Sequence, residues 1–265
     1  MADAAGPEPR RANLGGVEIA YVDVPPAAGS EPREHPVLLV HGFASNRNVN
    51  WIATGWTSTL SRAGYRVVAF DNRGHGESTK LYRPEDYDTS RMAGDAVGLL
   101  DHLGIGRAHV MGYSMGARIT AFTALEHPDR VETVLLGGLG IHLVEGVGLP
   151  LGIADAMEAP SADGLSDPMQ KMFRVFAEQT KSDLKALAAC IRGSRQTLSR
   201  DEVARISMPS LVSVGTRDPI AGSAAELADL LPRGRALDIP GRDHNLAVGD
   251  RVHKEGVLAF LAEQR

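Results

Sequence analysis

Short apolar runs bounded by turn-forming residues recur along this chain and alternate with helical stretches. The run Val37–Val40 is continuous and follows a segment rich in Pro, Gly and Glu, as is typical of a strand covered on both faces of a sheet. Similar strands are predicted over 17–24, 65–70, 108–111, 131–136, 211–214 and 235–239, and helices over 90–103, 115–125, 224–231 and 252–262. Strands that alternate with helices in this way favour right-handed crossovers. The predicted fold class is therefore α/β, with a mostly parallel sheet and helices on both faces.

The alternation lapses between residues 141 and 206. Prolines break this part of the chain, and helices are predicted over 169–180 and 183–192 with no strand between them. We therefore expect one domain whose core comprises residues 1–140 and 207–265. Residues 141–206 are expected to form an all-helical insertion in that core.

The bulk composition argues against several classes of protein. A formal net charge of -5 and a pI near 6.0 give no overall positive field, so neither nucleic acid nor an anionic membrane surface is expected as a partner. Cys190 is the only cysteine, which excludes an intrachain disulfide and favours a cytoplasmic protein. Residues 1–11 are polar, lack the apolar core of a signal peptide and are expected to form a loose tail. No apolar run is long enough to cross a bilayer.

A Gly-Tyr-Ser-Met-Gly sequence follows the strand predicted over 108–111 and opens the next helix. This is the context of a G-x-S-x-G nucleophile elbow, in which a serine projects from a sharp strand-to-helix turn. Gly112 and Gly116 suit such a turn because side chains at these positions would collide. The string also arises by chance in a glycine-rich chain, so its place between a strand and a helix is what supports the prediction. Ser114 is the predicted nucleophile.

A serine nucleophile needs a histidine that takes its proton and a buried acid that orients the histidine. In elbow enzymes the acid and then the histidine follow the serine along the chain. Asp218 comes just after the strand over 211–214, and His244 comes after the next strand, so both lie where this order predicts. We therefore predict Asp218 as the acid and His244 as the base.

Other residues compete for these two roles. Asp243 adjoins His244 in sequence and is poorly placed to face its ring, and Asp238 lies within a predicted strand. Among the histidines, His253 falls on the last helix and is expected to be exposed. Four others have no partner at a strand end and are interpreted as solvated or core residues: His102, His109, His127 and His142.

The segment His41-Gly42-Phe43 follows the strand Val37–Val40, where such enzymes need a backbone N–H group for the oxyanion. We expect that donor to be Phe43. The second would be the N–H of Met115, which directly follows the nucleophile at a helix N-terminus whose dipole favours negative charge. His41 is expected to make a structural hydrogen bond rather than to take part in the chemistry.

Taken in order, these motifs resemble the α/β-hydrolase superfamily over nearly the whole chain. The resemblance rests on His41-Gly42-Phe43, on the stretch Asp71-Asn72-Arg73-Gly74-His75-Gly76-Glu77-Ser78, on the elbow at Ser114, and on the late Asp218 and His244. It implies a core sheet of eight strands, and it makes residues 141–206 a short helical cap inserted after strand 6. It also implies structural roles for Arg73 and His75 in a loop that buttresses the site.

Departures from other members of this superfamily narrow the expected chemistry. Haloalkane dehalogenases and epoxide hydrolases of this fold use an aspartate where this chain has Ser114, and His41-Gly42-Phe43-Ala44 differs from the His-Gly-Gly-Gly loop of the hormone-sensitive-lipase branch. We expect a carboxylic ester hydrolase that acts on a small or medium ester through an acyl-enzyme, with no cofactor and no metal. Three alternatives stay open: C–C bond hydrolysis on the same triad, perhydrolysis, and a binding protein of this fold that does not hydrolyse its ligand.

Apolar residues of the predicted cap are candidates for lining a substrate pocket. They can line an acyl site or pack onto the core, and for any single residue packing is the favoured interpretation. These residues are Leu149, Leu151, Met157, Met169, Met172, Phe173 and Phe176.

Overall fold

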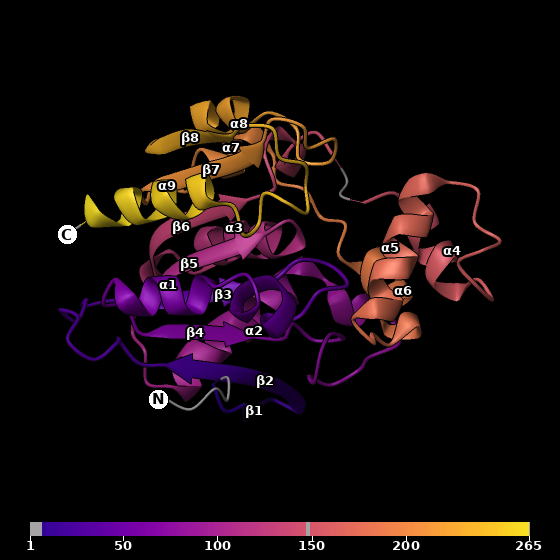
Figure 1. Cartoon of the computed structure of the whole chain (residues 1–265), viewed down its shortest axis with the longest axis horizontal. Helices are drawn as coiled ribbons and strands as arrows, with labels where there is room; N and C mark the ends of the chain where they lie inside the picture. Colours follow the sequence, from indigo (N-terminus) through magenta and orange to yellow (C-terminus); the bar gives the residue numbers. More distant parts are fainter. Residues whose placement is uncertain (1–6, 147–148, 265) are drawn as a thin grey trace.

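Eight strands form one sheet in the part of the chain that the computed structural model describes, residues 7–146 and 149–264. Their order across the sheet is β1-β2-β4-β3-β5-β6-β7-β8 (Figure 1). The first two strands run antiparallel to their neighbours, and all other pairs are parallel. The strands are β1 (Arg10–Leu14), β2 (Val17–Val24), β3 (Val37–Val40), β4 (Val67–Phe70), β5 (Ala108–Tyr113), β6 (Val131–Gly137), β7 (Ser210–Gly215) and β8 (Gly234–Ile239). The predicted α/β fold with a mostly parallel, eight-stranded sheet is confirmed.

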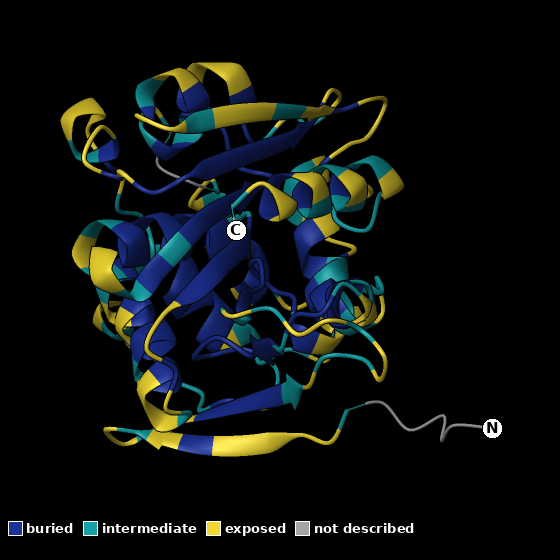
Figure 2. Cartoon of the chain, turned by 90° about the vertical axis from the view of Figure 1, so that its left-hand side faces the viewer, coloured by how far each residue is buried: buried dark blue, intermediate teal, exposed yellow. Residues whose placement is uncertain are grey.

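Helices cover both faces of the sheet because its central strands are apolar on both sides. In β3, Leu38 and Val40 pack into one cluster of buried side chains, and Val37 and Leu39 pack into the other. The first cluster is covered by α2 (Thr89–His102), α3 (Met115–Glu126) and α8 (Ala224–Leu230), and the second by α1 (Trp56–Arg62) and α9 (Arg251–Ala262). Figure 2 shows this buried layer between helices whose outer faces are exposed.

Between β6 and β7 the described residues form helices and no strand. The helices α4 (Gly152–Glu158), α5 (Pro168–Gln179) and α6 (Leu184–Gly193) stand together beyond the carboxyl ends of the parallel strands (Figure 1), whereas α7 (Arg200–Val203) contacts α3 of the core. Short turns of other helix types lie at Asn48–Ile52, Pro84–Tyr87, Pro128–Arg130 and Ile141–Leu143. A helical layer therefore faces the edge where the loops after β3, β5, β7 and β8 meet.

The expectation of a loose N-terminal tail is wrong for its last residues. Arg10 and Arg11 belong to β1, which pairs with β2 through a turn at Gly15 and Gly16, both with positive φ (63° and 96°). This strand is hard to recognise in the sequence because most of its side chains are polar and only Ala12 is fully buried. Residues 1–6 of the predicted tail lie outside the described residues.

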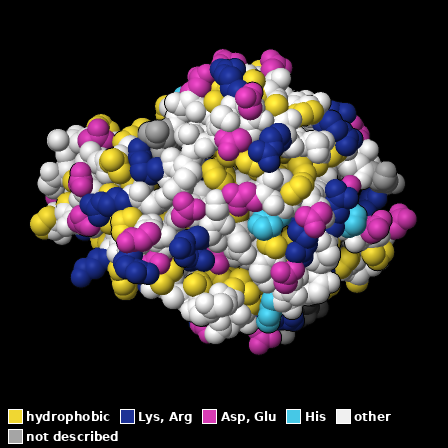
Figure 3. All heavy atoms as spheres, turned by 180° about the vertical axis from the view of Figure 1, so that it is seen from behind, with side chains coloured by type: hydrophobic (Ala, Val, Ile, Leu, Met, Phe, Trp, Pro, Cys, Tyr) yellow, Lys and Arg dark blue, Asp and Glu magenta, His cyan; other side chains and the backbone are white. Residues whose placement is uncertain are grey.

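The surface carries charges of both signs. Acidic and basic side chains are interspersed on the face seen in Figure 3 rather than separated into regions of one sign. Within residues 7–146 and 149–264, none of the helices has the length and the apolar character that a membrane crossing requires.

Candidate active site

The turn between β5 and α3 holds Ser114 in a strained backbone conformation, with φ 55° and ψ -114°. The residues two positions before and two positions after it must be glycines, because the backbone around the turn leaves no space for a Cβ atom. A Cβ on Gly112 would lie 2.1 Å from the carbonyl oxygen of Gly116, and a Cβ on Gly116 would lie 2.0 Å from that of Val40. This turn therefore accepts no side chain at either position, and it leaves the serine as the residue that projects from the end of β5.

Ser114, His244 and Asp218 come from three separate loops and meet at the carboxyl ends of the parallel strands. Oγ of Ser114 lies 2.9 Å from Nε2 of His244, and Nδ1 of His244 lies 2.7 Å from Oδ2 of Asp218. Because an ionised carboxylate only accepts hydrogen bonds, Nδ1 carries the ring proton and Nε2 accepts from the serine hydroxyl. The structure thus brings together the three side chains that the sequence predicts as nucleophile, base and acid.

Hydrogen bonds from neighbouring residues hold both Asp218 and the loop of His244 in place. The side chain of Asp218 is fully buried, and its Oδ1 accepts hydrogen bonds from the N–H groups of Ile220 at 2.8 Å and Ala221 at 3.2 Å. The hydroxyl of Tyr113 donates to the carbonyl oxygen of His244 at 2.6 Å. Tyr113 directly precedes the serine, so one strand end positions both the nucleophile and the loop that carries the histidine.

The two competing acids lie elsewhere. Asp243 turns its carboxylate onto its own loop, where Oδ1 accepts from the N–H groups of Asn245 at 3.0 Å and Leu246 at 2.8 Å. Asp238 is exposed on β8. Among the three aspartates considered, Asp218 is therefore the one that contacts the ring of His244.

The residues that carry the predicted oxyanion donors lie beside Ser114. Phe43 and Met115 both border a cavity beside the serine. The N–H of Phe43 makes no hydrogen bond to any described residue, and Met115 is the first residue of α3, where helical N–H groups lack an intrahelical acceptor. Oδ1 of Asn50 accepts from the N–H of Gly42 at 3.1 Å and so fixes the start of this loop. Asn50 is a supporting residue that the sequence motifs do not reveal.

Two buried histidines lie behind the loop that carries Phe43. Nε2 of His41 accepts from the N–H of Asn72 at 2.9 Å, so its Nδ1–H donates to the carbonyl oxygen of Gly42 at 2.7 Å. Burial lowers the pKa of His41 to about 4, which keeps the ring neutral. The ring of His75 packs against those of His41 and Phe43, with centroids 5.2 and 5.9 Å apart. His41 thus makes the structural hydrogen bond that the sequence predicts.

Arg73 also acts within the framework of the site. It forms a two-pronged, buried ion pair with Asp95, with Nε–Oδ2 and Nη2–Oδ1 distances of 2.7 Å, and it donates to the carbonyl oxygen of Asp86 at 2.7 Å. These bonds tie the loop after β4 to α2. They occupy the guanidinium group and are consistent with the structural role that the family resemblance implies.

His253 is buried, so the expectation of an exposed side chain is wrong. Its Nε2 lies 2.9 Å from Oγ of Ser213, and its ring lies 5.0 Å from that of Trp56. It occupies the face of α9 that packs on the sheet, four residues before the buried Val257. That spacing was the signal in the sequence, because residues four apart share one side of a helix.

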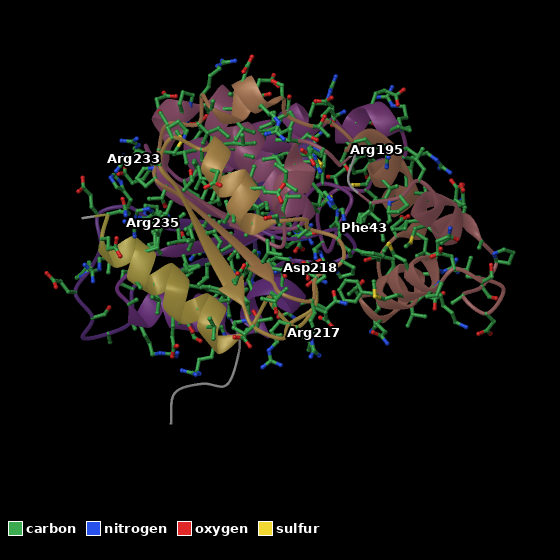
Figure 4. The ribbon with its side chains drawn as sticks, turned by 90° about the horizontal axis from the view of Figure 1, so that it is seen from above. Phe43, Arg195, Arg217, Asp218, Arg233 and Arg235 are labelled. Carbon is green, nitrogen blue, oxygen red and sulfur yellow. The ribbon has the colours of Figure 1, made fainter. Side chains whose placement is uncertain are left out.

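Two cavities meet at Ser114. The smaller, of about 50 Å³, is lined by Phe43, Ser114, Met115, Arg118, Gly138, Leu139, His142, Leu149, Ile191, Ser194 and Ile220. The larger, of about 340 Å³, is lined by Gly42, Phe43, Ser45, Val49, Asn50, Thr54, Tyr113, Ser114, Phe173, Phe176, His244, Asn245 and Val248. In Figure 4, Phe43 lies between the sheet and the helices α4 to α6, and Asp218 lies at the end of the sheet nearby. A bound molecule can therefore extend from the serine in two directions.

The apolar residues predicted for the cap have different environments. Leu149 lines the smaller cavity, and Phe173 and Phe176 line the larger one. Met157 is buried and Met169 packs against the core cluster, whereas Leu151 and Met172 are 51% and 39% exposed. Three of these seven residues thus border the cavities, together with Arg118 and His142, which the sequence analysis did not assign to the site.

Two further kinds of site have little support in the described residues. No three His, Cys, Asp or Glu side chains among them are placed to hold a metal ion. Cys190 is buried, and burial raises the pKa of its thiol to about 12, which opposes formation of a reactive thiolate. Ser114 therefore stays the predicted nucleophile.

A serine on a strained turn after a central parallel strand, followed along the chain by an acid and a histidine that reach it, is the arrangement of an α/β hydrolase. A family model described as alpha/beta hydrolase fold matches residues 35–145. A relative from Pseudomonas putida, named as the dihydrolipoyllysine-residue acetyltransferase component of an acetoin cleaving system, is 30% identical over 97% of this chain and 70% of its own length. The chain belongs to the alpha/beta hydrolase fold family, which confirms the resemblance seen in its motifs.

Other similar proteins carry different named activities. Epoxide hydrolase A of Mycobacterium tuberculosis is 36% identical over 48% of this chain, a match that spans 37% of that relative's length. A non-heme chloroperoxidase of Streptomyces lividans is 28% identical over 93% of this chain and 96% of its own length. A solved structure of a hydrolase from Pseudomonas aeruginosa PA01 has a TM-score of 0.75 at 26% identity, covering 96% of this chain and 98% of that chain.

Proposed function

We propose that this protein is a serine hydrolase of carboxylic esters, with Ser114 as nucleophile, His244 as base and Asp218 as the orienting acid. The observation that carries the proposal is the continuous chain of hydrogen bonds from Oγ of Ser114 through His244 to the buried carboxylate of Asp218, with distances of 2.9 and 2.7 Å. Membership of a hydrolase family supports hydrolysis. A serine rather than an aspartate at the elbow favours an acyl-enzyme over epoxide opening.

In the first half of the reaction, the acyl group moves to the enzyme. Nε2 of His244 accepts the proton of Ser114 while Oγ attacks the ester carbonyl carbon, and the carboxylate of Asp218 stabilises the imidazolium ion. The N–H groups of Phe43 and Met115 are the proposed donors to the oxyanion, each contributing about 3–4 kcal/mol to the transition state. The imidazolium then gives its proton to the leaving alcohol oxygen as the C–O bond breaks.

In the second half, water enters the place of the alcohol. His244 takes a proton from the water as its oxygen attacks the acyl carbon, and the proton returns to Oγ of Ser114 when the bond to the enzyme breaks. The products are one alcohol and one carboxylic acid, and Ser114 is restored. Two cavities that meet at the serine suit the two halves of an ester, and we further propose that residues 141–206 act as the cap that closes over them.

The proposal is tested by Ser114→Ala and His244→Ala. Both should lower turnover of p-nitrophenyl acetate by roughly 10⁴-fold or more, because the triad acts as a unit. The wild-type protein should also be labelled once per chain by a fluorophosphonate, at Ser114 in the digested peptide, and Ser114→Ala should remain unlabelled. Full turnover by either variant would remove the proposed roles. Labelling of the wild type without repeated turnover of any ester would instead identify a binding protein.

Hydrogen peroxide is a second candidate acceptor for the acyl group, and the similarity to one relative favours it. The match to a protein named non-heme chloroperoxidase runs over nearly the full length of both chains. Attack of hydrogen peroxide on the acyl-enzyme, in place of water, would release a peracid and restore Ser114. Peracid formation from acetic acid and hydrogen peroxide, measured beside ester hydrolysis, decides between the two. Peracid formation that exceeds hydrolysis of p-nitrophenyl acetate would make perhydrolysis the main activity.

A further inference from the structure

Arg118 is a buried cation that borders the smaller cavity. Its side chain follows Ser114 by one turn of α3, and the residue is only 3% exposed. Within the described residues it makes hydrogen bonds to backbone carbonyl oxygens and forms no ion pair: Nη1 donates to Gln196 at 2.6 Å, and Nη2 donates to His142 at 3.2 Å and Gly146 at 3.3 Å. A buried charge is costly unless it is paired, so the absence of a carboxylate partner needs a physical reason.

A second arginine, Arg195, lies near Arg118, so the positive charge of Arg118 is not neutralised by its neighbours. Burial lowers the pKa of Arg118 to about 10, and the nearby positive charge of Arg195 acts in the same direction. Arg195 donates to the carbonyl oxygen of Leu149 at 2.7 Å, at the junction between the core and the helices α4 to α6 (Figure 4). Arg118 therefore remains protonated at neutral pH and is offset only by the dipoles of three carbonyl groups.

The carbonyl contacts leave part of the guanidinium group unused. Arginine offers five N–H donors, and no hydrogen bond from Nε of Arg118 is made to the described residues. Two other polar side chains of the cavity already donate to the backbone: Oγ of Ser194 donates to the carbonyl oxygen of Cys190 at 2.7 Å, and Nδ1–H of His142 donates to that of Ile220 at 2.7 Å. Arg118 is therefore the cation of this lining that has an unused donor. Apart from Ser114 and Gly138, the rest of the lining is apolar: Phe43, Met115, Leu139, Leu149, Ile191 and Ile220.

We propose that the smaller cavity binds a carboxylate at the far end of the acyl group, with Arg118 as its counter-ion. The preferred substrates are then half-esters of short dicarboxylic acids. This inference rests on the ester hydrolysis proposed above and specifies its substrate class. A substrate carboxylate provides the negative charge that the protein omits, and the charge-assisted hydrogen bonds it accepts are among the strongest that a buried site offers.

The dimensions of the site limit the acyl group to a short one. Four residues of helix advance about 6 Å along the axis, and Ser114 and Arg118 line the same small cavity, so a group bound between them is short. A cavity of about 50 Å³ holds only a few groups the size of a water molecule, each of which needs about 10–15 Å³. A spacer of about two carbons between the ester carbonyl and the carboxylate fits both limits, as in a succinyl group.

The test compares two esters that have nearly the same shape and differ in charge. Monomethyl succinate carries the carboxylate, and methyl succinamate carries a neutral amide in its place. The value of kcat/KM for each is measured at pH 7 by titration of the acid released. For the wild-type protein we expect the half-ester to be preferred by at least about tenfold, because a site built around a charge rejects the neutral analogue.

Two arginine variants locate the source of that preference. Arg118→Gln should lower the ratio of the two kcat/KM values by about tenfold or more, and Arg118→Lys should retain part of it. Arg192→Gln removes the same charge from α6, where the side chain pairs with Glu158 outside the cavity, and should leave the ratio unchanged. Because both esters are measured on one preparation, loss of folded protein cancels from the ratio. A wild-type ratio near one, or an equal loss of both activities in Arg118→Gln, would overturn the inference.

Binding to Ser114→Ala separates this inference from the proposed reaction. We expect calorimetry to show tighter binding of monomethyl succinate than of methyl succinamate, with the difference lost in the double variant that also carries Arg118→Gln. If the wild type hydrolyses no ester but this difference is present, the proposed reaction fails and the carboxylate site stands. If p-nitrophenyl acetate is hydrolysed and neither measurement separates the two esters, the carboxylate site fails alone.

Discussion

Asp218 decides which nitrogen of His244 carries the proton. Asp218→Asn keeps the size of the side chain but offers an amide N–H toward Nδ1, which favours the tautomer with its proton on Nε2, facing Ser114. We expect kcat for p-nitrophenyl acetate to fall by roughly 10⁴-fold, as the loss of the correct tautomer does in other triads. Steady-state kinetics measures this, with circular dichroism to show that the variant is folded.

Asp243→Asn is the matched control, since it makes the same change one residue before His244. The Asp243 carboxylate only accepts from backbone N–H groups of its own loop, and an asparagine oxygen can accept the same bonds. Its kcat should stay within a few fold of the wild-type value. Equal losses in the two variants would mean that the position of the loop, and not the proton on His244, explains the effect.

The sequence was enough to predict the three residues that meet at Ser114, but not the residues that support them. Ser114, Asp218 and His244 are recognisable because each lies in the loop or turn after a strand and because their order along the chain is fixed by the fold. Asn50 and Arg118 act through groups distant in sequence: Asn50 holds the N–H of Gly42, and Arg118 holds carbonyl groups at both ends of the helical insertion. A local sequence pattern does not predict these hydrogen bonds, because they join residues that come together only when the chain is folded.

At the scale of elements, the turn between β5 and α3 has no space for a side chain at its two glycines. Gly116→Ala places a methyl group against the backbone of β3, which cannot move aside without disturbing the sheet. We expect the free energy of unfolding to fall by at least about 1–3 kcal/mol, measured by urea denaturation, because overpacking strains a rigid core. If the variant does not fold at all, Gly112→Ala expressed beside it should fail as well.

Gly94→Ala provides the opposite case within α2. Gly94 is exposed, and a Cβ there would meet nothing within 4 Å. In a helix interior this change should raise the free energy of unfolding by about 0.5–1 kcal/mol. Similar losses of stability in Gly94→Ala and Gly116→Ala would contradict the steric argument for the elbow.

The two longer helices between β6 and β7 were predictable from their helical pattern, and each begins at a capping aspartate. Asp167 and Asp183 accept from the N–H groups at the starts of α5 and α6, and the predicted ranges for these helices agree with the structure to within one residue. In contrast, α1 follows Gly55 and α4 follows Leu151, neither of which makes a side-chain cap, and both helices are only seven residues long. Packing against the rest of the molecule stabilises them, and a single stretch of sequence does not contain that information.

At the scale of the whole molecule, buried histidines make stability depend on pH. Burial lowers the pKa of His253 to about 4, and the same cause lowers that of His41 and His109 to about 4 and that of His75 to about 3. Above about pH 6.5 these rings are neutral in both the folded and the unfolded chain. As the pH falls toward 4, the unfolded chain binds protons that the folded protein refuses, so stability is lost in this window.

His253→Gln tests this dependence away from the reacting atoms. At pH 5 one such histidine costs about 2 kcal/mol of stability relative to pH 7. We therefore expect the loss of unfolding free energy between pH 7 and pH 5 to be about 2 kcal/mol smaller in the variant than in the wild type. Urea denaturation at both pH values measures it, and parallel losses in the two proteins would show that His253 is not held neutral by burial.

The two linings around the nucleophile share Ser114 and Phe43 and otherwise consist of different residues. In the proposed reaction, the part of the ester that becomes the acid and the part that leaves as the alcohol would therefore contact separate sets of side chains. Natural variation or laboratory selection can alter one set, for example Val49, Thr54 and Val248, without reshaping the other. If the proposed reaction holds, such changes would admit new leaving groups and leave the binding of the acid part as it is.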